Sequence, residues 1–276
     1  MTELQSLYLE LLKKTLIDFH RLDTKGYRPA ITGRKINWLV RPLMRFFKSL
    51  DKRELEICEM VSFNPEDRMN GKDWPSHAES MIGYKRLSNV QDCVISVINN
   101  NIEGDLVETG VWRGGTVIFM RGILKVFGVT DRLVWAADSF EGLPRPNPEK
   151  YNADKDDKFY TFDELRVSLE TVRENFKKYG LLDDQVKFLK GWFKDTLPTA
   201  PIGKLAVLRL DGDMYESTMD ALVNLYPRLS AGGYIIIDDW GVVEGCRLAV
   251  QDYRKKNNIT DAIIPIDEDG VYWKKL

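Results

Sequence analysis

The segment Glu108-Thr-Gly-Val-Trp-Arg-Gly-Gly-Thr116 decides the fold of this chain. It follows the apolar run of residues 105–109 and opens a stretch of helical character, residues 116–126. Glycines at such a turn let the backbone bend sharply and approach a ligand closely. The spacing is G-x-x-x-G-G rather than the G-x-G-x-x-G that admits a dinucleotide pyrophosphate, and the acidic Glu108 suits a cationic or amine-bearing ligand. The segment therefore predicts a small-molecule site at the end of a buried strand, or a purely structural tight turn.

Outward from this turn, short apolar runs alternate with helical stretches. The runs are nearly continuous in Val, Ile and Leu, as is typical of strands buried on both faces of a parallel sheet. They cover residues 105–109, 133–138, 186–189, 205–211 and 234–239, and the crossover helices are expected at 116–126, 162–179, 219–229 and 245–257. Two last runs, 262–266 and 270–273, flank an Asp-Glu-Asp-Gly turn and predict a terminal antiparallel hairpin at one sheet edge. The alternation predicts an α/β fold with a doubly wound, mostly parallel sheet.

Length and composition narrow the class of protein. The 276 residues, 43% hydrophobic and 30% charged, suffice for one large α/β domain with extensions. The net charge of -2 argues against a nucleic-acid binder held by bulk electrostatics, and no apolar run is long enough to predict a membrane span. Cys58, Cys93 and Cys246 are too widely separated for a disulfide framework or a cysteine metal site. We therefore expect a cytoplasmic protein.

The first hundred residues differ in character from the rest. They look mostly helical, so we divide the chain into a helical N-terminal extension, residues 1–100, and an α/β domain, residues 101–276. Residues 34–53 interleave basic with aromatic and apolar side chains. This pattern predicts either a solvated helix whose apolar face packs on the domain or a second subunit, which we favour, or a basic amphipathic helix at a membrane surface. Residues 144–157 hold three prolines and a run of charge, and predict a loop that could act as a lid over a cleft.

Asp138 closes the second predicted strand, in the segment Ala-Ala-Asp138-Ser139-Phe-Glu-Gly-Leu-Pro. It lies roughly 30 residues after the glycine-rich turn, near the position where Rossmann-like folds place a carboxylate that accepts both ribose hydroxyls. The alternative is an aspartate that only caps a turn.

Four more carboxylates follow two of the predicted strands. Asp211 and Asp213 come at the end of the fourth strand, and Asp238 and Asp239 at the end of the fifth. Because the carboxyl ends of parallel strands face one crevice, these groups would repel one another strongly unless a cation lay among them. Oxygen donors without Cys or a nearby His favour a hard divalent ion such as Mg²⁺ over zinc. The sequence therefore predicts a divalent-cation site, the alternative being acids scattered over surface loops.

Tyr215 and Glu216 are expected on the rim of the same crevice. His20 and His77 are expected to be structural or exposed.

Together these segments resemble the macrocin O-methyltransferase family, which includes sugar O-methyltransferases of macrolide and aminocoumarin antibiotic biosynthesis. The resemblance covers about residues 80–252. It is carried by Glu108-Thr-Gly-Val-Trp-Arg-Gly-Gly-Thr116, Asp138-Ser-Phe-Glu-Gly-Leu-Pro144, Gly191-Trp-Phe193, Asp211-Gly-Asp-Met-Tyr-Glu-Ser-Thr218 and Gly232-Gly-Tyr-Ile-Ile-Ile-Asp-Asp-Trp240. It implies a class I S-adenosylmethionine (SAM) methyltransferase fold over residues 101–276, and Mg²⁺-dependent methyl transfer to a sugar hydroxyl.

The resemblance also assigns roles to single residues. It implies metal ligation by Asp211, Asp238 and Asp239, and a general base at Asp213, a task that Asp211 could share. The SAM site is implied at Ser80, Met81, Glu108, Gly110, Gly114, Asp138, Ser139 and Asp211. Ser80 stands where members of the family usually carry Thr, and it keeps the hydroxyl. The first 75 residues match poorly, so the acceptor is the least defined part. A homo-oligomer is expected, with the N-terminal extension as lid and oligomerisation region.

Three functions other than sugar O-methylation are compatible with parts of the sequence. An NAD-linked oxidoreductase is disfavoured by the absence of G-x-G-x-x-G. A Mg²⁺-dependent catechol-type O-methyltransferase uses a similar carboxylate trio on an aromatic diol. A non-catalytic surface-binding protein on the same fold would use the basic residues 34–53.

Overall fold

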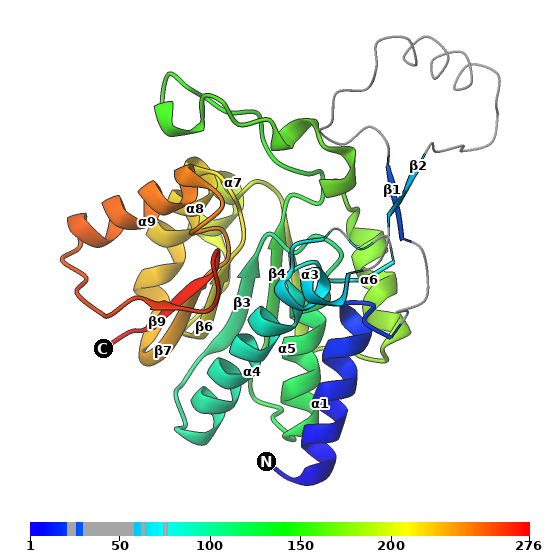
Figure 1. Cartoon of the computed structure of the whole chain (residues 1–276). Helices are drawn as coiled ribbons and strands as arrows, with labels where there is room; N and C mark the ends of the chain where they lie inside the picture. Colours follow the sequence, from blue (N-terminus) through cyan, green and yellow to red (C-terminus); the bar gives the residue numbers. More distant parts are fainter. Residues whose placement is uncertain (21–25, 30–57, 62–63, 74, 76) are drawn as a thin grey trace.

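The computed structural model describes residues 1–20, 26–29, 58–61, 64–73, 75 and 77–276 (Figure 1). Its centre is a seven-stranded sheet in the order β5-β4-β3-β6-β7-β9-β8. The strands are β3 (Asp105–Thr109), β4 (Val134–Asp138), β5 (Val186–Lys190), β6 (Leu205–Leu210), β7 (Leu229–Ile237), β8 (Ile264–Pro265) and β9 (Val271–Lys274). β3 to β7 are parallel, whereas β9 runs antiparallel to both β7 and β8. The doubly wound sheet and its terminal antiparallel hairpin are thereby confirmed.

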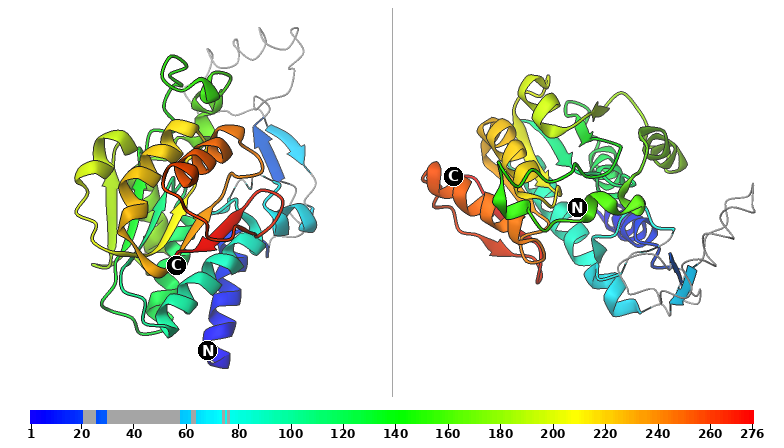
Figure 2. Two further views of the ribbon diagram at one scale, coloured as in Figure 1. Left: turned by 90° about the vertical axis from the view of Figure 1, so that its left-hand side faces the viewer. Right: turned by 90° about the horizontal axis from the view of Figure 1, so that it is seen from above.

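Helices cover both faces of this sheet (Figures 1 and 2). On one face lie α1 (Glu3–Leu16), α4 (Gly83–Asn99), α5 (Gly115–Val126) and α6 (Leu169–Lys178), and on the other lie α7 (Phe193–Thr196), α8 (Tyr215–Leu225) and α9 (Glu244–Lys256). Successive strand residues alternate between the two cores, so Leu106 joins the first and Val107 the second. α5 is buried at every residue from Gly115 to Leu124, because α1 and α4 pack against it in addition to the sheet.

Some element boundaries differ from prediction. The helix expected from residue 162 begins only at Leu169, where the Ser168 side chain accepts the Thr171 N–H at 3.1 Å and caps α6. The short 3₁₀ turns η2 (Phe159–Thr161) and η3 (Asp163–Leu165) come before it. α8 begins at Tyr215 rather than at residue 219, and it gives way at Tyr226 to the 3₁₀ turn η5 (Tyr226–Arg228), whose proline cannot donate a helical hydrogen bond. β7 therefore starts at Leu229, earlier than predicted.

The N-terminal hundred residues hold helices and, in addition, a small sheet. α1, α3 (Pro65–Asn70) and α4 are helical as expected, but β1 (Gly26–Pro29) and β2 (Cys58–Val61) pair antiparallel, which the sequence did not indicate. Leu9 and Leu16 of α1 share one hydrophobic core with the sheet. The basic segment 34–53 lies outside the described residues. Among the helices that the structure describes, none is both long and apolar enough to cross a membrane.

Candidate active site

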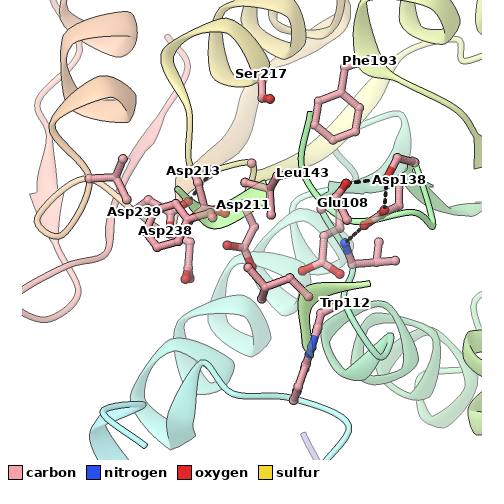
Figure 3. A pocket seen from close by; sticks show the side chains of 18 of the residues that line it. Glu108, Trp112, Asp138, Leu143, Phe193, Asp211, Asp213, Ser217, Asp238 and Asp239 are labelled. Atoms are coloured by element: carbon pink, nitrogen blue, oxygen red, sulfur yellow. Dashed lines mark hydrogen bonds between the residues drawn. The ribbon is translucent and has the colours of Figure 1, made fainter. Parts of the chain in front are cut away.

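A cavity of about 460 Å³ opens at the carboxyl ends of β3, β4, β6 and β7 (Figure 3). It is roofed by residues 143–165, here named the covering segment, which cross above the strand ends in both Figures 1 and 2. Leu143, Pro144, Arg145, Asn147, Phe159 and Leu165 of this segment line the cavity. The covering segment includes the loop predicted at residues 144–157 and carries the 3₁₀ turn η1 (Asn152–Asp154). Its place over a cleft is as predicted.

The glycine-rich turn brings three segments into close contact. Gly110 has a φ of +83°, and a Cβ there would lie 1.7 Å from the carbonyl oxygen of Asp211. A Cβ on Gly115 would lie 2.4 Å from Cβ of Ser80. Glycine is therefore required where β3 meets the end of β6 and where α5 meets the segment around Ser80. Gly110, Gly115, Ser80 and Met81 line the cavity, whereas Gly114 is not one of the described residues that do so.

Asp138 organises the turns on either side of the cavity. Its Oδ2 accepts the Val111 N–H at 2.7 Å and its Oδ1 accepts the Phe140 N–H at 2.7 Å. Burial raises the pKa of Asp138, and the backbone N–H groups oppose that rise. The neighbouring Ser139 hydroxyl donates to the Gly142 carbonyl at 2.6 Å. These contacts match the capping alternative, and Asp138 also lines the cavity, which leaves it within reach of a ligand hydroxyl.

Arg209 joins the two halves of the site. This fully buried residue of β6 lies opposite Glu108 of β3 in the sheet register. Its Nη1 donates to Glu108 Oε1 and, at 2.7 Å, to Asp211 Oδ2, while its Nη2 donates to Asp238 Oδ1. One guanidinium thus partly neutralises the buried carboxylates of Glu108 and Asp238 and the half-buried carboxylate of Asp211, and burial without a counter-ion would strongly disfavour the ionised forms.

Glu108 lines the cavity, and one of its carboxylate oxygens is not paired. It is buried, and burial raises its pKa to about 8 while Arg209 opposes the rise. Oε1 pairs with Arg209, whereas Oε2 accepts no hydrogen bond of ordinary geometry within the described part of the chain, although the nearby Thr116 side chain helps to lower the pKa. A buried carboxylate oxygen without a donor is costly, and an ammonium group would satisfy it. The residues at this end of the cavity therefore fit the amino-acid part of SAM.

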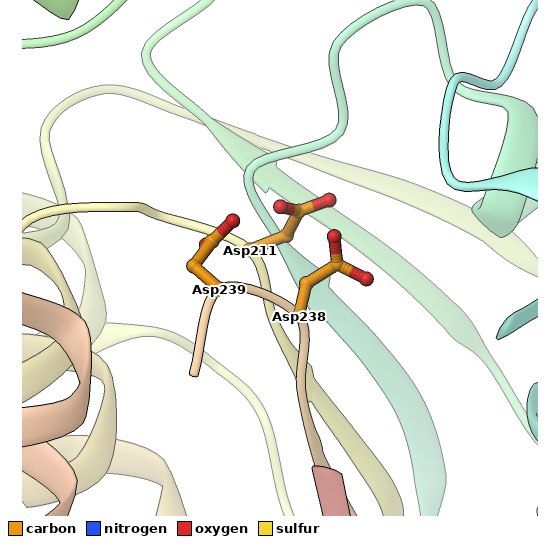
Figure 4. Close-up of side chains that lie close together, drawn as sticks. All are labelled: Asp211, Asp238 and Asp239. Carbon is orange, nitrogen blue, oxygen red and sulfur yellow. The ribbon is translucent and has the colours of Figure 1, made fainter. Parts of the chain in front are cut away.

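Asp211, Asp238 and Asp239 converge from the ends of β6 and β7 (Figure 4). One oxygen of each lies within 4.8 Å of one oxygen of the others. Burial, then the neighbouring carboxylates, raise the pKa of Asp239 well above its usual range, and burial raises that of Asp211 to about 6. Asp238 is held by two arginines, Arg209 at Oδ1 and Arg86 at Oδ2, the latter at 2.6 Å.

This trio fits a hard divalent cation. Each carboxylate oxygen that accepts from an arginine retains a lone pair for a metal, and the donor set is entirely oxygen. A cation would also relieve the repulsion that raises the pKa of Asp239.

Asp213 lies beside the trio on the cavity wall (Figure 3). Its φ of +56° places it in the left-handed region, and its backbone N–H donates to Asp239 Oδ2 at 3.1 Å. Burial, followed by the charge of Asp211, raises the pKa of Asp213 well above its usual range. All four predicted acidic residues of β6 and β7 thus meet at one end of the cavity.

Of the two residues predicted on the rim of the crevice, one lines the cavity and the other does not. Glu216 lines the cavity, but Tyr215 turns away from it, and its hydroxyl contacts Asp252 at 3.0 Å. His20 and His77 are exposed and are not found among the described cavity-lining residues.

Sequence reasoning missed Arg209 and Arg86. Arg209 carried a signal, since a charged residue inside the apolar run of residues 205–210 demands buried partners. Arg86 carried none, because its partners Asp238, Asp267 and Asp269 are brought to α4 only by the fold.

The known proteins that this chain resembles are O-methyltransferases. A model of the family described as macrocin-O-methyltransferase (TylF) matches residues 5–275. A mycinamicin III 3''-O-methyltransferase of Micromonospora griseorubida is 46% identical over 272 residues, 98% of this chain and 96% of that protein. An 8-demethyl-8-(2,3-dimethoxy-alpha-L-rhamnosyl)-tetracenomycin-C 4'-O-methyltransferase of Streptomyces olivaceus is 56% identical over 210 residues, 76% of this chain and 80% of that protein.

A solved structure of the O-methyltransferase NovP superimposes with a TM-score of 0.83 at 48% identity, covering 98% of this chain and 99% of that one. The class I SAM methyltransferase fold is thereby confirmed. The chain belongs to the macrocin O-methyltransferase family and is a SAM-dependent O-methyltransferase.

Proposed function

We propose that this enzyme transfers a methyl group from SAM to a hydroxyl of a sugar-containing small molecule, with Mg²⁺ held by Asp211, Asp238 and Asp239. The observation that carries the proposal is the meeting, in one cavity, of an unpartnered Glu108 oxygen with that carboxylate trio and Asp213. The sugar acceptor is supported by the rhamnosyl group in the name of the Streptomyces olivaceus relative. Natural-product biosynthesis, such as that of an antibiotic, is the setting in which we place it.

The donor end would be formed by the ends of β3 and β4 and by the segment that precedes α4. Glu108 Oε2 would accept a hydrogen bond from the ammonium group of SAM, and Asp138 would accept from the ribose hydroxyls. Gly110, Ser80, Met81 and Ser139 would shape the walls around it. The covering segment would exclude water, which strengthens these polar interactions.

The acceptor end would lie at Asp211, Asp213, Asp238 and Asp239. When bound, SAM supplies an electrophilic methyl group and Mg²⁺ supplies positive charge that acidifies and orients a nearby hydroxyl. Asp213 would accept the proton of that hydroxyl, since it lies beside the trio and lines the cavity. Asp211 would hold the cation, and we assign the proton to Asp213 because Asp211 is already bound by Arg209.

The proposal can be tested by measuring the binding of SAM and then the methylation of an acceptor. Calorimetric titration of SAM, its demethylated product and NAD, each with Mg²⁺ and with EDTA, is expected to show SAM binding and no NAD binding. Mass spectrometry would then follow methylation of 6-deoxysugar glycosides and of catechols. We expect methylated glycoside only with Mg²⁺. Methylation of catechols alone would favour the catechol-type enzyme, and absent SAM binding would contradict the proposal altogether.

The proton acceptor can be tested in the same assay. Asp213→Asn should lower kcat by about 10²–10⁴-fold, the usual contribution of a general base. Asp184→Asn is the matched control, because Asp184 is exposed and is not one of the described residues around the cavity. Equal rates for Asp213→Asn and the wild type would show that another group accepts the proton.

We also propose that residues 1–100 contribute a lid and an oligomer interface to the domain formed by residues 101–276. Leu4, Leu7 and Leu11 of α1 are 78%, 65% and 65% exposed and recur at helical spacing, which supports burial against a second copy. Sedimentation of the wild type and of Leu7→Glu should show an oligomer and its loss. A monomeric wild type would contradict this assignment.

A further inference from the structure

Asp154 of the covering segment is a buried carboxylate that the proposed chemistry does not use. Only 3% of it is exposed. Its Oδ1 accepts the Tyr215 N–H at 2.7 Å and its Oδ2 accepts the Glu216 N–H at 3.0 Å, so both oxygens bind the first turn of α8. The residue that precedes α8, Met214, contributes no side-chain cap among the contacts that the structure describes. Because the first N–H groups of a helix lack intrahelical partners and carry partial positive charge, Asp154 supplies the missing cap from 61 residues earlier in the chain.

The start of α9 is shaped to admit this carboxylate. A Cβ on Gly245 would lie 2.8 Å from Asp154 Oδ1 and 3.1 Å from the Tyr215 nitrogen, which is too close for an undisturbed contact. Beside it, the rings of Tyr151 and Tyr215 lie with their centroids 5.4 Å apart. The covering segment, α8 and α9 thus meet at one joint built around a single carboxylate.

This joint lies two residues from Asp213. The chain between β6 and α8 turns tightly there, with the Met214 N–H donating to the Gly212 carbonyl at 2.6 Å and Asp213 in the left-handed region. The position of the first turn of α8 therefore constrains the backbone of Asp213. In the other direction along the chain, Asn147 and Phe159 on either side of Asp154 line the cavity.

We propose that Asp154 is a positioning residue for methyl transfer: by capping α8 it seats the covering segment over the cavity and fixes the backbone of Asp213. The half that concerns Asp213 rests on the proposed function given above, whereas the half that concerns the covering segment does not.

Two variants are expected to disrupt the joint, one in the covering segment and one at the start of α9. Asp154→Asn keeps the size of the side chain but removes its charge from the helix terminus. Gly245→Ala leaves every charge in place and pushes the Asp154 carboxylate aside, while alanine in a helix is intrinsically more favourable than glycine. Asp156→Asn is the matched control, since Asp156 is an exposed acid of the same segment.

The first measurement is the dissociation rate of S-adenosylhomocysteine by stopped-flow displacement, without metal or acceptor. We expect both variants to release it about tenfold faster than the wild type and Asp156→Asn, the scale of a lost helix cap. Trypsin should cut faster at the basic residues of the covering segment. The melting temperature of Gly245→Ala should not fall, which a merely structural role of Asp154 would not predict. If Gly245→Ala released S-adenosylhomocysteine at the wild-type rate and trypsin cut its covering segment at the wild-type rate, the proposal would be overturned, even if Asp154→Asn failed to fold.

The second measurement is turnover with Mg²⁺ and a glycoside acceptor. We expect kcat to fall at least fivefold in both variants at saturating SAM, because displacement of the first turn of α8 would move the backbone that carries Asp213. Faster cofactor release with unchanged kcat would overturn the link to Asp213. A wild type that binds SAM but methylates no sugar would contradict the proposed function and leave the first measurement intact.

Discussion

At the scale of single residues, Arg209 is the group on which the site depends. It is fully buried and binds Glu108, Asp211 and Asp238. Removing one partner from a buried ion network costs more than the network contributes, since the charges left behind have neither water nor a counter-ion.

Arg209→Gln should therefore lower the free energy of unfolding by about 3–5 kcal/mol, measured by urea denaturation. Lys204→Gln is its control, because the pair of Lys204 with Glu103, at 2.6 Å, is exposed at the surface. Such exposed pairs contribute only about 0–1 kcal/mol. Similar losses in both variants would show that Arg209 is not an energetic centre of the site.

A substitution of Glu108 tests how the enzyme recognises SAM, the methyl donor. The sulfonium of SAM loses its positive charge on methyl transfer, so a nearby carboxylate should favour SAM over the neutral sulfide product. Glu108→Gln should weaken SAM about tenfold and S-adenosylhomocysteine less, measured by calorimetry, since tenfold corresponds to about 1.4 kcal/mol. Comparable losses for both ligands would mean that Glu108 acts only on the ammonium group, which both ligands carry, and not on the sulfonium.

At the scale of elements, the turn between β3 and α5 is held by steric limits. Gly110 has a positive φ, and its missing side chain lets Asp211 approach. Gly128 also has a positive φ, +67°, but no described atom would lie within 4 Å of a Cβ there. A substitution at Gly128 therefore tests backbone strain alone, whereas one at Gly110 also tests the close approach of Asp211.

We expect Gly128→Ala to cost about 1 kcal/mol of unfolding free energy, the price of left-handed strain alone. Gly110→Ala should cost several times more and abolish SAM binding, because the Cβ would meet the Asp211 carbonyl oxygen at 1.7 Å. Thermal melts and SAM titration of both variants provide the measurement. Equal effects would mean that the approach of β6 does not require glycine.

At the scale of the whole molecule, the raised pKa values of two acids at the site predict how stability depends on pH. The pKa of Asp211 is raised to about 6 and that of Glu108 to about 8, both chiefly by burial. Between the lower pKa of the unfolded chain and these values, the native protein binds more protons than the unfolded one. The contribution of these groups to stability is therefore complete at low pH and is lost as the pH rises through about 6 to 8.

Urea unfolding in EDTA should accordingly show a lower midpoint at pH 8 than at pH 5. Mg²⁺ should raise the midpoint at pH 8 and have little effect at pH 5, because it stabilises the ionised carboxylates. Asp239→Asn should abolish the effect of Mg²⁺. A midpoint that rises from pH 5 to pH 8 in EDTA would contradict the raised pKa values.

Local sequence patterns suffice to predict the sheet, its hairpin and the acidic residues at its edge. Those features depend on local patterns: continuous apolar runs, a glycine-rich turn, and carboxylates placed directly after strands, as at Asp211 and Asp238. Parallel strands bring their carboxyl ends together, so a position in the chain becomes a position in the crevice. The beginning of α6 could not be placed as well, since the cap at Ser168 competes with the helical pattern that precedes it.

The pairing of the charges, in contrast, depends on contacts between segments that are far apart in the chain. Arg86 reaches Asp238 from 152 residues away, and Asp154 caps α8 from another part of the chain. Which acid meets which arginine depends on the packing of α4 and of the covering segment against the sheet, and no sequence spacing encodes that contact. The physical reason is that a buried charge must find a partner in space, whereas a strand or a turn needs only its neighbours along the chain.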